Sequence, residues 1–352
     1  DQGGLTAGIT GILAGHDVNV LDIGQAVIHS TLSIGVWVEV PDARHGAQIR
    51  TDLQAFADAR GLAARFSEVT ADSYTDWISA QGRARYIVTL LARKITADQL
   101  SRVTAVVHDF GLNIDGINRL SGRIPLGDLP PRSKACVEFS VRGNLPDAQA
   151  FRRALLEVAS ELDVDLALQQ DNMYRRNRRL VAFDMDSTLI EAEVIDELAA
   201  EAGVGEQVAA ITERAMRGEL DFAGSFRERV ALLRGLPESA LEDVVKRIAI
   251  TEGAEHLIAT LNRLGYTTAI LSGGFPYFAE RLAEHLGIHY VYANTLDIED
   301  GVVSGRVVGE IVDGARKAEL LTQLAAQEGI DLQQVIAVGD GANDLPMLSA
   351  AG

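Results

Sequence analysis

Val181-Ala-Phe-Asp184-Met-Asp186-Ser-Thr-Leu-Ile190 places two carboxylates two residues apart at the end of an apolar run, with two hydroxyl residues directly after them. An apolar run that ends in polar residues is typical of a buried strand, and open α/β sheets bind ligands at the carboxyl ends of such strands. Two carboxylates this close repel each other unless they share a cation or a proton. The stretch indicates a site at the edge of an α/β sheet, but this spacing of two aspartates is also common in acidic proteins, so the interpretation depends on partners further along the chain.

Composition and charge narrow the class of protein. At 352 residues the chain exceeds the size at which one core usually suffices, so we expect two or three domains. The apolar content of 47% is ample for packed cores, and the net charge of −18 argues against a surface for nucleic acid or an anionic membrane. No apolar run approaches the ~18 residues of a membrane span. Because Cys136 is the only cysteine, no disulfide forms within the chain, and the cytoplasm is the expected compartment.

The first part of the chain reads as two copies of one pattern, which we assign to domains over residues 1–80 and 81–170. The first copy is predicted as a helix, two strands, a helix and a strand, at residues 5–14, 18–27, 31–40, 44–59 and 62–69. The second adds a strand in front, with elements at residues 86–92, 97–110, 112–120, 135–141, 147–162 and 164–169. This order is the ferredoxin-like split βαβ arrangement. The chain begins at Asp1 without an initiator methionine, and we expect the first strand of the first copy to be missing.

The second part reads as an α/β domain over residues 179–352, after a polar, basic linker at residues 171–179. Predicted strands alternate with helices, which is typical of a parallel, doubly wound sheet, and they lie at residues 180–184, 267–272, 289–293 and 335–339. Residues 191–250 show only helical patterning, so we expect a helical cap over the catalytic edge. The chain stops just after a helix-like segment, and we expect further strands to be missing at that end.

Three further segments suit the same chemistry as the paired aspartates. Ser272-Gly273-Gly274 follows a predicted strand and precedes a helix, where free backbone N–H groups suit an anion. Lys317 offers a point charge of the kind that neutralises phosphate. The stretch Gly339-Asp340-Gly-Ala-Asn343-Asp344 ends another apolar strand, and Asp340 supplies a second carboxylate for a hard cation.

These four segments, in this order, resemble the signature motifs of the haloacid dehalogenase superfamily of phosphotransferases. Within it, residues 180–352 are most similar to the phosphoserine phosphatases. The residues that carry this closer likeness are Glu193, Met216, Phe222, Arg229 and the sequence Thr251-Glu-Gly-Ala. The resemblance implies Mg²⁺-dependent hydrolysis of O-phospho-L-serine, the last step of serine biosynthesis. A phosphatase for another small phosphomonoester remains an alternative.

The resemblance also implies roles for individual residues. Asp184 is expected to form an aspartyl-phosphate, and Asp186 to protonate the departing serine oxygen and then deprotonate water. Mg²⁺ is expected to bind Asp184, Asp340 and the main chain of Asp186. The residues expected to bind the substrate are Ser272, Gly273, Lys317 and Asn343 around the phosphate, and Glu193, Met216, Phe222 and Arg229 in the cap. Asp344 is expected to support the phosphate, Lys317 or a metal-bound water from behind. Arg229 also has the simpler interpretation of a surface helix charge, since Arg227 and Arg234 lie nearby.

The amino-terminal copies resemble the ACT domain, a small regulatory module that binds amino acids, because the split order is joined by Asp1-Gln-Gly3-Gly4-Leu-Thr at the first turn. The resemblance implies side-by-side pairing into a homodimer and an amino-acid effector, expected to be L-serine, near Gly3, Gly4, Asn19 and Asn113. Alternatively, both asparagines simply begin strands after tight turns, which asparagine favours. In the second copy Arg93-Lys-Ile-Thr96 replaces the glycine-rich turn, so at most one type of copy is expected to bind ligand.

Overall fold

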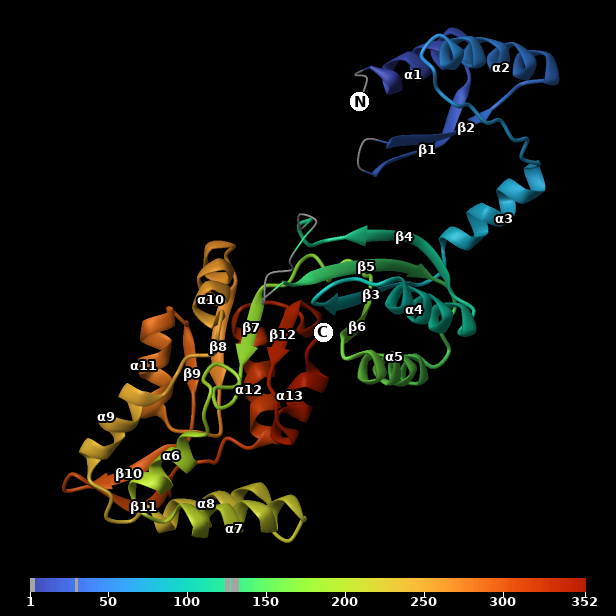
Figure 1. The fold of residues 1–352 in the computed structure, drawn as a ribbon. Coiled ribbons are helices and arrows are strands. Elements are labelled where there is room, and N and C mark those ends of the chain that lie inside the picture. Colours follow the sequence, from blue (N-terminus) through green and yellow to red (C-terminus); the bar gives the residue numbers. More distant parts are fainter. Residues whose placement is uncertain (1–3, 29–30, 124–126, 128–132) are drawn as a thin grey trace. The chain divides into compact units, whose positions relative to one another are not determined.

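The computed structural model describes residues 4–28, 31–123, 127 and 133–352 of the chain. The chain divides into two compact units, Asp1–Arg83 and Ala84–Gly352 (Figure 1). The second unit contains both a split βαβ module and the α/β module with the aspartate motif. None of the helices in the described ranges is both long and apolar enough to cross a membrane.

The first unit contains α1 (Leu5–Gly15), β1 (Asn19–Ile28), β2 (Thr31–Glu39), α2 (Ala43–Asp58) and α3 (Ala71–Gln81). β1 and β2 pair antiparallel along their length, and α1 contacts α2. The strand predicted at residues 62–69 does not form, and this prediction is wrong. Its physical reason is a missing partner: in the second module the last strand pairs only with the first, and the described residues hold no strand before α1.

Helix α3 goes beyond the predicted elements of the first unit. It places Tyr74 and Trp77 against Trp37 of β2, with ring centroids 6.0 and 5.0 Å from the Trp37 ring. Aromatic pairs at such distances add to the free energy gained by burying their area. We infer that this three-ring contact holds α3 in the first unit.

The split βαβ module of the second unit follows its predicted order. It consists of β3 (Arg85–Ala92), α4 (Ala97–Asp109), β4 (Asn113–Arg119), β5 (Ala135–Arg142), α5 (Ala148–Leu162) and β6 (Asp165–Gln170). The sheet order is β4-β5-β3-β6 with antiparallel pairs throughout. Alternate residues of β5 are buried, and Phe139 on that face packs with Phe151 and Leu155 of α5. The period-2 pattern of β5 thus directs one sheet face onto the helices.

The α/β module is built on a parallel sheet of order β12-β7-β8-β9. Its strands are β7 (Leu180–Phe183), β8 (Thr267–Leu271), β9 (Tyr290–Tyr292) and β12 (Val335–Val338). Helices α10 (Ala254–Arg263), α11 (Pro276–Leu286), α12 (Gly314–Gln327) and α13 (Leu345–Ala350) complete it. All of β7 is buried: Val181 and Phe183 share a core with Phe278, whereas Leu180 and Ala182 share another with Leu321. A strand apolar on both sides is what a doubly covered parallel sheet requires.

The predicted run of helices after the aspartate motif is present as α6 (Val194–Glu201), α7 (Gly205–Met216), α8 (Phe222–Leu232) and α9 (Glu238–Arg247). The antiparallel hairpin of β10 (Thr295–Glu299) and β11 (Val302–Val308), which was not predicted, contacts α8 (Figure 1). A backbone bond from Gly235 N to Val303 O, 2.8 Å long, fixes this contact. A hairpin from later in the chain therefore packs against the helices of the cap.

Candidate active site

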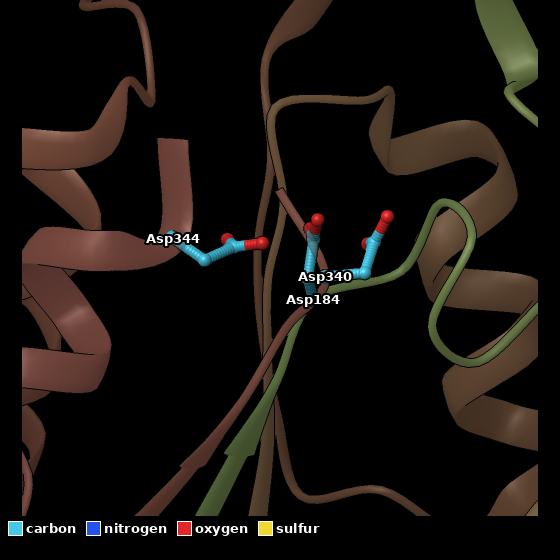
Figure 2. Close-up of side chains that lie close together, drawn as sticks. All are labelled: Asp184, Asp340 and Asp344. Carbon is cyan, nitrogen blue, oxygen red and sulfur yellow. The ribbon is translucent and has the colours of Figure 1, made fainter. Parts of the chain in front are cut away.

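The four predicted segments meet at one edge of the parallel sheet. Asp184, Ser272 and Asp340 follow the carboxyl ends of β7, β8 and β12, and Lys317 lies in the first turn of α12. Parallel strands bring all their carboxyl ends to the same edge, so residues more than 150 positions apart become neighbours. One ligand atom from each of Asp184, Asp340 and Asp344 lies within 4.8 Å of the others (Figure 2).

Lys317 is the only described lysine that is fully buried, with 0% of its surface exposed. Its Nζ lies 2.8 Å from Asp184 Oδ1 and donates a hydrogen bond of 2.6 Å to Asp344 Oδ1. The other oxygen of Asp344 accepts from the Gly341 amide at 3.0 Å. A buried ammonium between two carboxylates is compensated by charge, which is the condition for keeping it in the interior.

The paired aspartates differ in their affinity for a proton. Burial raises the pKa of Asp184 to about 6, with the charge of Lys317 opposing the rise. Burial raises the pKa of Asp186 to about 8, and the negative charge of Glu193 adds to it. The Asp186 side chain accepts a hydrogen bond of 3.1 Å from the backbone N–H of Val194. Near neutral pH, Asp184 is therefore the carboxylate and Asp186 the carboxylic acid.

The Ser272-Gly273-Gly274 loop lies close to neighbouring side chains at both glycines. Ser272 is completely buried, and its Oγ accepts from the Gly274 amide at 2.9 Å. A Cβ on Gly273 would lie 2.9 Å from the Phe222 ring, and one on Gly274 would lie 2.8 Å from Asp186 Oδ2. The backbone of this loop therefore approaches both the cap and the acid.

Two charged residues of the cap face the aspartates. Glu193 is the N-cap of α6, and its Oε1 accepts a bond of 2.8 Å from Ser187 Oγ. Arg229 lies in the last turn of α8, and burial lowers its pKa against the opposing charges of Asp196, Glu193 and Asp186. Its Nε is buried and has no acceptor among the described residues. A half-buried guanidinium with an unused, buried donor suits a ligand anion.

The other residues predicted to bind substrate differ in how far they are buried. Phe222 is half-buried and stacks on Phe226 with ring centroids 5.9 Å apart. Met216, at the end of α7, is 85% exposed, so it forms no buried apolar wall in this structure. Asn343 is half-buried in a 3-10 turn (Ala342–Asp344) beside Gly341.

Several residues of the site were not predicted. Thr188 donates to Asp340 Oδ1 at 3.1 Å, and Ser187 adopts a positive φ of 55° to reach Glu193. Both hydroxyls stand in the aspartate motif, which was the available signal. Asn294 contacts the Ser272 loop through its side chain, and nothing in its local sequence marks it.

The predicted effector residues lie at strand starts or outside the described part. Asn19 opens β1 and donates to Glu39 Oε2 at 3.3 Å, and Asn113 opens β4 and donates to Asp115 Oδ1 at 3.0 Å. Gly4 is the N-cap of α1 with φ 89°. Gly3 lies outside the described residues. Both asparagine side chains are thus engaged within their own modules.

Comparison with protein families assigns each module. Residues 181–349 match the haloacid dehalogenase-like hydrolase family. Residues 1–67 and 84–169 each match an ACT domain family. The two amino-terminal modules therefore correspond to ACT domains, and the α/β module corresponds to the hydrolase family.

Individual relatives agree with this assignment. A phosphoserine phosphatase of Streptomyces coelicolor is 41% identical over 352 residues, which cover all of this chain and 82% of the relative. One of Mycobacterium tuberculosis is 41% identical over 355 residues, covering all of this chain and 83% of the relative. The crystal structure of a haloacid dehalogenase family hydrolase from Salmonella enterica superposes with a TM-score of 0.63 at 30% identity, covering 76% of this chain and 87% of that one. That of a probable phosphoserine phosphatase from Vibrio cholerae gives 0.56 at 34% identity, covering 77% of each chain. The chain belongs to the phosphoserine phosphatase family of haloacid dehalogenase-like hydrolases, with two ACT domains before the hydrolase domain.

Proposed function

We propose that the chain hydrolyses O-phospho-L-serine to L-serine and phosphate, as the last step of serine biosynthesis. The observation that carries the proposal is the pairing of a half-buried Arg229, whose buried Nε lacks an acceptor among the described residues, with an Asp184–Lys317 pair at the sheet edge. The relatives that cover the whole chain carry the name phosphoserine phosphatase. A site for a carboxylate next to a site for a phosphate fits this substrate.

The first step forms a bond between a carboxylate oxygen of Asp184 and phosphorus. The bond from phosphorus to the serine oxygen breaks, and Asp186 gives its proton to that oxygen. In the second step Asp186 takes a proton from water, whose oxygen attacks phosphorus and releases Asp184 and phosphate. The difference in pKa between the two aspartates, about 6 against about 8, supports this division.

The residues at the sheet edge fit Mg²⁺. Asp184 Oδ1 is buried and, among the described residues, accepts no hydrogen bond of good geometry, although Lys317 Nζ lies 2.8 Å away. Asp340 lies beside it, and both oxygens of Asp344 are already used by Lys317 and Gly341. Asp184, Asp340 and the main-chain carbonyl of Asp186 would hold the ion, with Asp344 positioning Lys317. Mg²⁺ would neutralise part of the phosphate charge during transfer.

The sheet edge would bind the phosphate group of the substrate, and the cap would bind its carboxylate and ammonium groups. Ser272, the Gly273 amide, Lys317 and Asn343 would contact the phosphate oxygens. Arg229 would bind the substrate carboxylate with two parallel hydrogen bonds, and Glu193 would accept from the ammonium group. Phe222 would exclude water from above the Gly273 amide, and Met216 would join it if the cap moves towards the sheet.

Two variants test the proposal. Asp184→Asn should abolish release of phosphate from phosphoserine in the presence of Mg²⁺, and retained turnover would contradict the nucleophile assignment. Arg229→Ala should lower kcat/KM for phosphoserine by about 100-fold and leave kcat/KM for p-nitrophenyl phosphate unchanged. Of the two substrates, phosphoserine alone has a carboxylate for Arg229 to bind. Arg227→Ala is the matched control, since Arg227 is exposed on the same helix. Equal loss on both substrates would favour another phosphomonoester as the natural one.

We also propose that the ACT domains, over residues 1–80 and 81–170, bind an amino acid, L-serine, and pair to give a homodimer. The family matches of both modules support the proposal. Calorimetry of the full chain with L-serine should detect binding that an Asn113→Ala or Asn19→Ala variant weakens. Light scattering should give twice the 37.8 kDa mass of the chain, and a monomer at micromolar concentration would oppose the pairing.

A further inference from the structure

Asn294 is a buried amide that follows β9 and lies behind the Ser272 loop. It is 1% exposed. Its backbone N donates to Gly274 O at 2.8 Å, and its Nδ2 donates to Gly273 O at 2.8 Å. Its Oδ1 accepts from Val312 N at 2.7 Å. Both polar atoms of the side chain are therefore bonded to backbone groups of other segments.

Those bonds join the two segments that carry the phosphate ligands. Gly273 and Gly274 belong to the loop that contains Ser272. Val312 directly precedes Asp313, the N-cap of α12, whose carbonyl accepts from Lys317 N at 2.9 Å. Asn294 thus bonds to the residue next to Ser272 and to the residue that precedes the first turn of α12, where Lys317 lies.

The Ser272 loop and the segment before α12 also lie against each other, so the bonds of Asn294 join two backbones that are already close. A Cβ on Gly273 would lie 3.6 Å from Val312 O, which places the loop backbone against the segment before α12. A primary amide satisfies a carbonyl and an amide at once, since it has both an acceptor and donors. A carboxylate of the same shape loses the donor, and an alanine leaves both backbone groups without their bond.

We propose that Asn294 is a positioning residue that sets the separation between the Ser272 loop and the start of α12, and hence the geometry of the phosphate site. The inference deepens the proposed function, because it concerns how the same site holds a transferring phosphoryl group. Small displacements of binding groups cost much in rate: a shift of 1 Å is worth on the order of 100-fold.

The test compares Asn294 with a second bridging amide far from the chemistry. Asn262 of α10 donates through Nδ2 to Gly287 O at 2.7 Å and accepts at Oδ1 from Thr268 Oγ1 at 3.3 Å. Thr268 stands near the amino end of β8, away from the site at its carboxyl end. Asn262→Asp and Asn262→Ala therefore reproduce the loss of a bridging amide without touching the phosphate segments.

Asn294→Asp and Asn294→Ala should lower kcat by about 10- to 100-fold and raise the inhibition constant of inorganic phosphate. The Asn262 variants should lower the melting temperature and leave both quantities within about twofold of wild type. Rates are expressed per folded molecule, with the folded fraction taken from circular dichroism, so a loss of folding is not counted as a loss of rate. Asn294→Asp keeps the shape of the side chain and gives the decision if Asn294→Ala does not fold.

Wild-type kcat and phosphate inhibition in Asn294→Asp would overturn the inference, and so would equal losses in the Asn262 variants. Failure of this proposal is separable from failure of the proposed substrate. The same measurements are made with p-nitrophenyl phosphate, which needs only the phosphate site. If the wild-type protein does not hydrolyse phosphoserine, the proposed function is wrong, but the comparison of Asn294 and Asn262 variants with p-nitrophenyl phosphate still tests this inference.

Discussion

Lys317 is the residue on which the charge balance of the site depends. Its ammonium is fully buried between Asp184 and Asp344, and it brings a positive charge to a cluster of three carboxylates. Buried charges that lose their partner are costly because the remaining charge keeps its desolvation penalty. Lys317 and its two carboxylate partners are therefore expected to stabilise the domain, in addition to the catalytic role proposed for them.

Lys317→Met should destabilise the hydrolase domain by about 3–5 kcal/mol and remove phosphatase activity, because it leaves Asp184 and Asp344 without their cation. Urea unfolding followed by circular dichroism measures the first effect. Lys246→Met is the control: Lys246 is exposed, and so is its ion pair with Asp243, so no measurable loss is expected. A Lys317→Met protein as stable as wild type would show that the two carboxylates need no cation.

Asp186→Asn should change how stability depends on pH in metal-free protein. The pKa of Asp186 is raised from 3.8 to about 8, so the folded state binds a proton more tightly than the unfolded state. The stability linked to this group is fully present below pH 3.8 and is lost as pH rises through about 8. The asparagine variant lacks that loss. Its melting temperature should therefore exceed that of wild type at pH 8.5 by roughly 2–4 °C for each kcal/mol recovered, and the gap should shrink at pH 5. A constant gap would contradict the assignment.

At the scale of elements, helix α8 carries two of the residues proposed to contact the substrate. Phe222 begins the helix and Arg229 lies in its last turn. The side chain of Asp221 caps the helix by accepting from Gly224 N at 2.6 Å. Without this cap the first turn would lose a bond that fixes Phe222 above Gly273.

Asp221→Ala should lower stability by about 1 kcal/mol and also raise KM for phosphoserine. Asp147→Ala provides the comparison, because Asp147 caps α5 of the second ACT domain in the same way, accepting from Ala150 N at 2.8 Å. Its loss of stability should be similar, with KM unchanged. Steady-state kinetics and thermal unfolding of the two variants check this, and an unchanged KM in Asp221→Ala would separate the cap from substrate binding.

On the scale of the whole molecule, the chain divides at Arg83, and the first unit contains a segment without regular structure before α3. Residues 63–70 form no helix or strand and are exposed, and the ion pair of Glu68 with Arg50 is exposed as well. Backbone that is exposed and outside regular structure is the preferred site of proteolysis.

Brief trypsin digestion should therefore cut first after Arg65 or Arg83, and the fragment that remains should keep phosphatase activity. Mass spectrometry identifies the sites, and the Arg65→Gln, Arg83→Gln double variant should resist the first cut. A first cut within the hydrolase domain, or activity lost in step with cleavage at these two sites, would contradict this division of stability.

The sequence by itself determined the elements whose signals are local. The apolar run before Asp184, the period-2 pattern of β5 and the glycines after Ser272 each carry their structure in a few residues, and four such segments predicted one sheet edge. Their chemistry followed from residue type and from the geometry of parallel strands.

The tertiary structure decided what depends on distant partners. Residues 62–69 lack a strand because β pairing needs a neighbour, while α3 exists where Trp37 offers a surface. The β10–β11 hairpin joins the cap through contacts with α8 and with the residues that follow it, which are remote from the hairpin in sequence. The exposure of Met216 and the bridging role of Asn294 likewise depend on backbone brought near, or kept away, by the rest of the fold. Hydrogen bonds and packing between remote segments leave no local pattern, so only the folded chain reveals them.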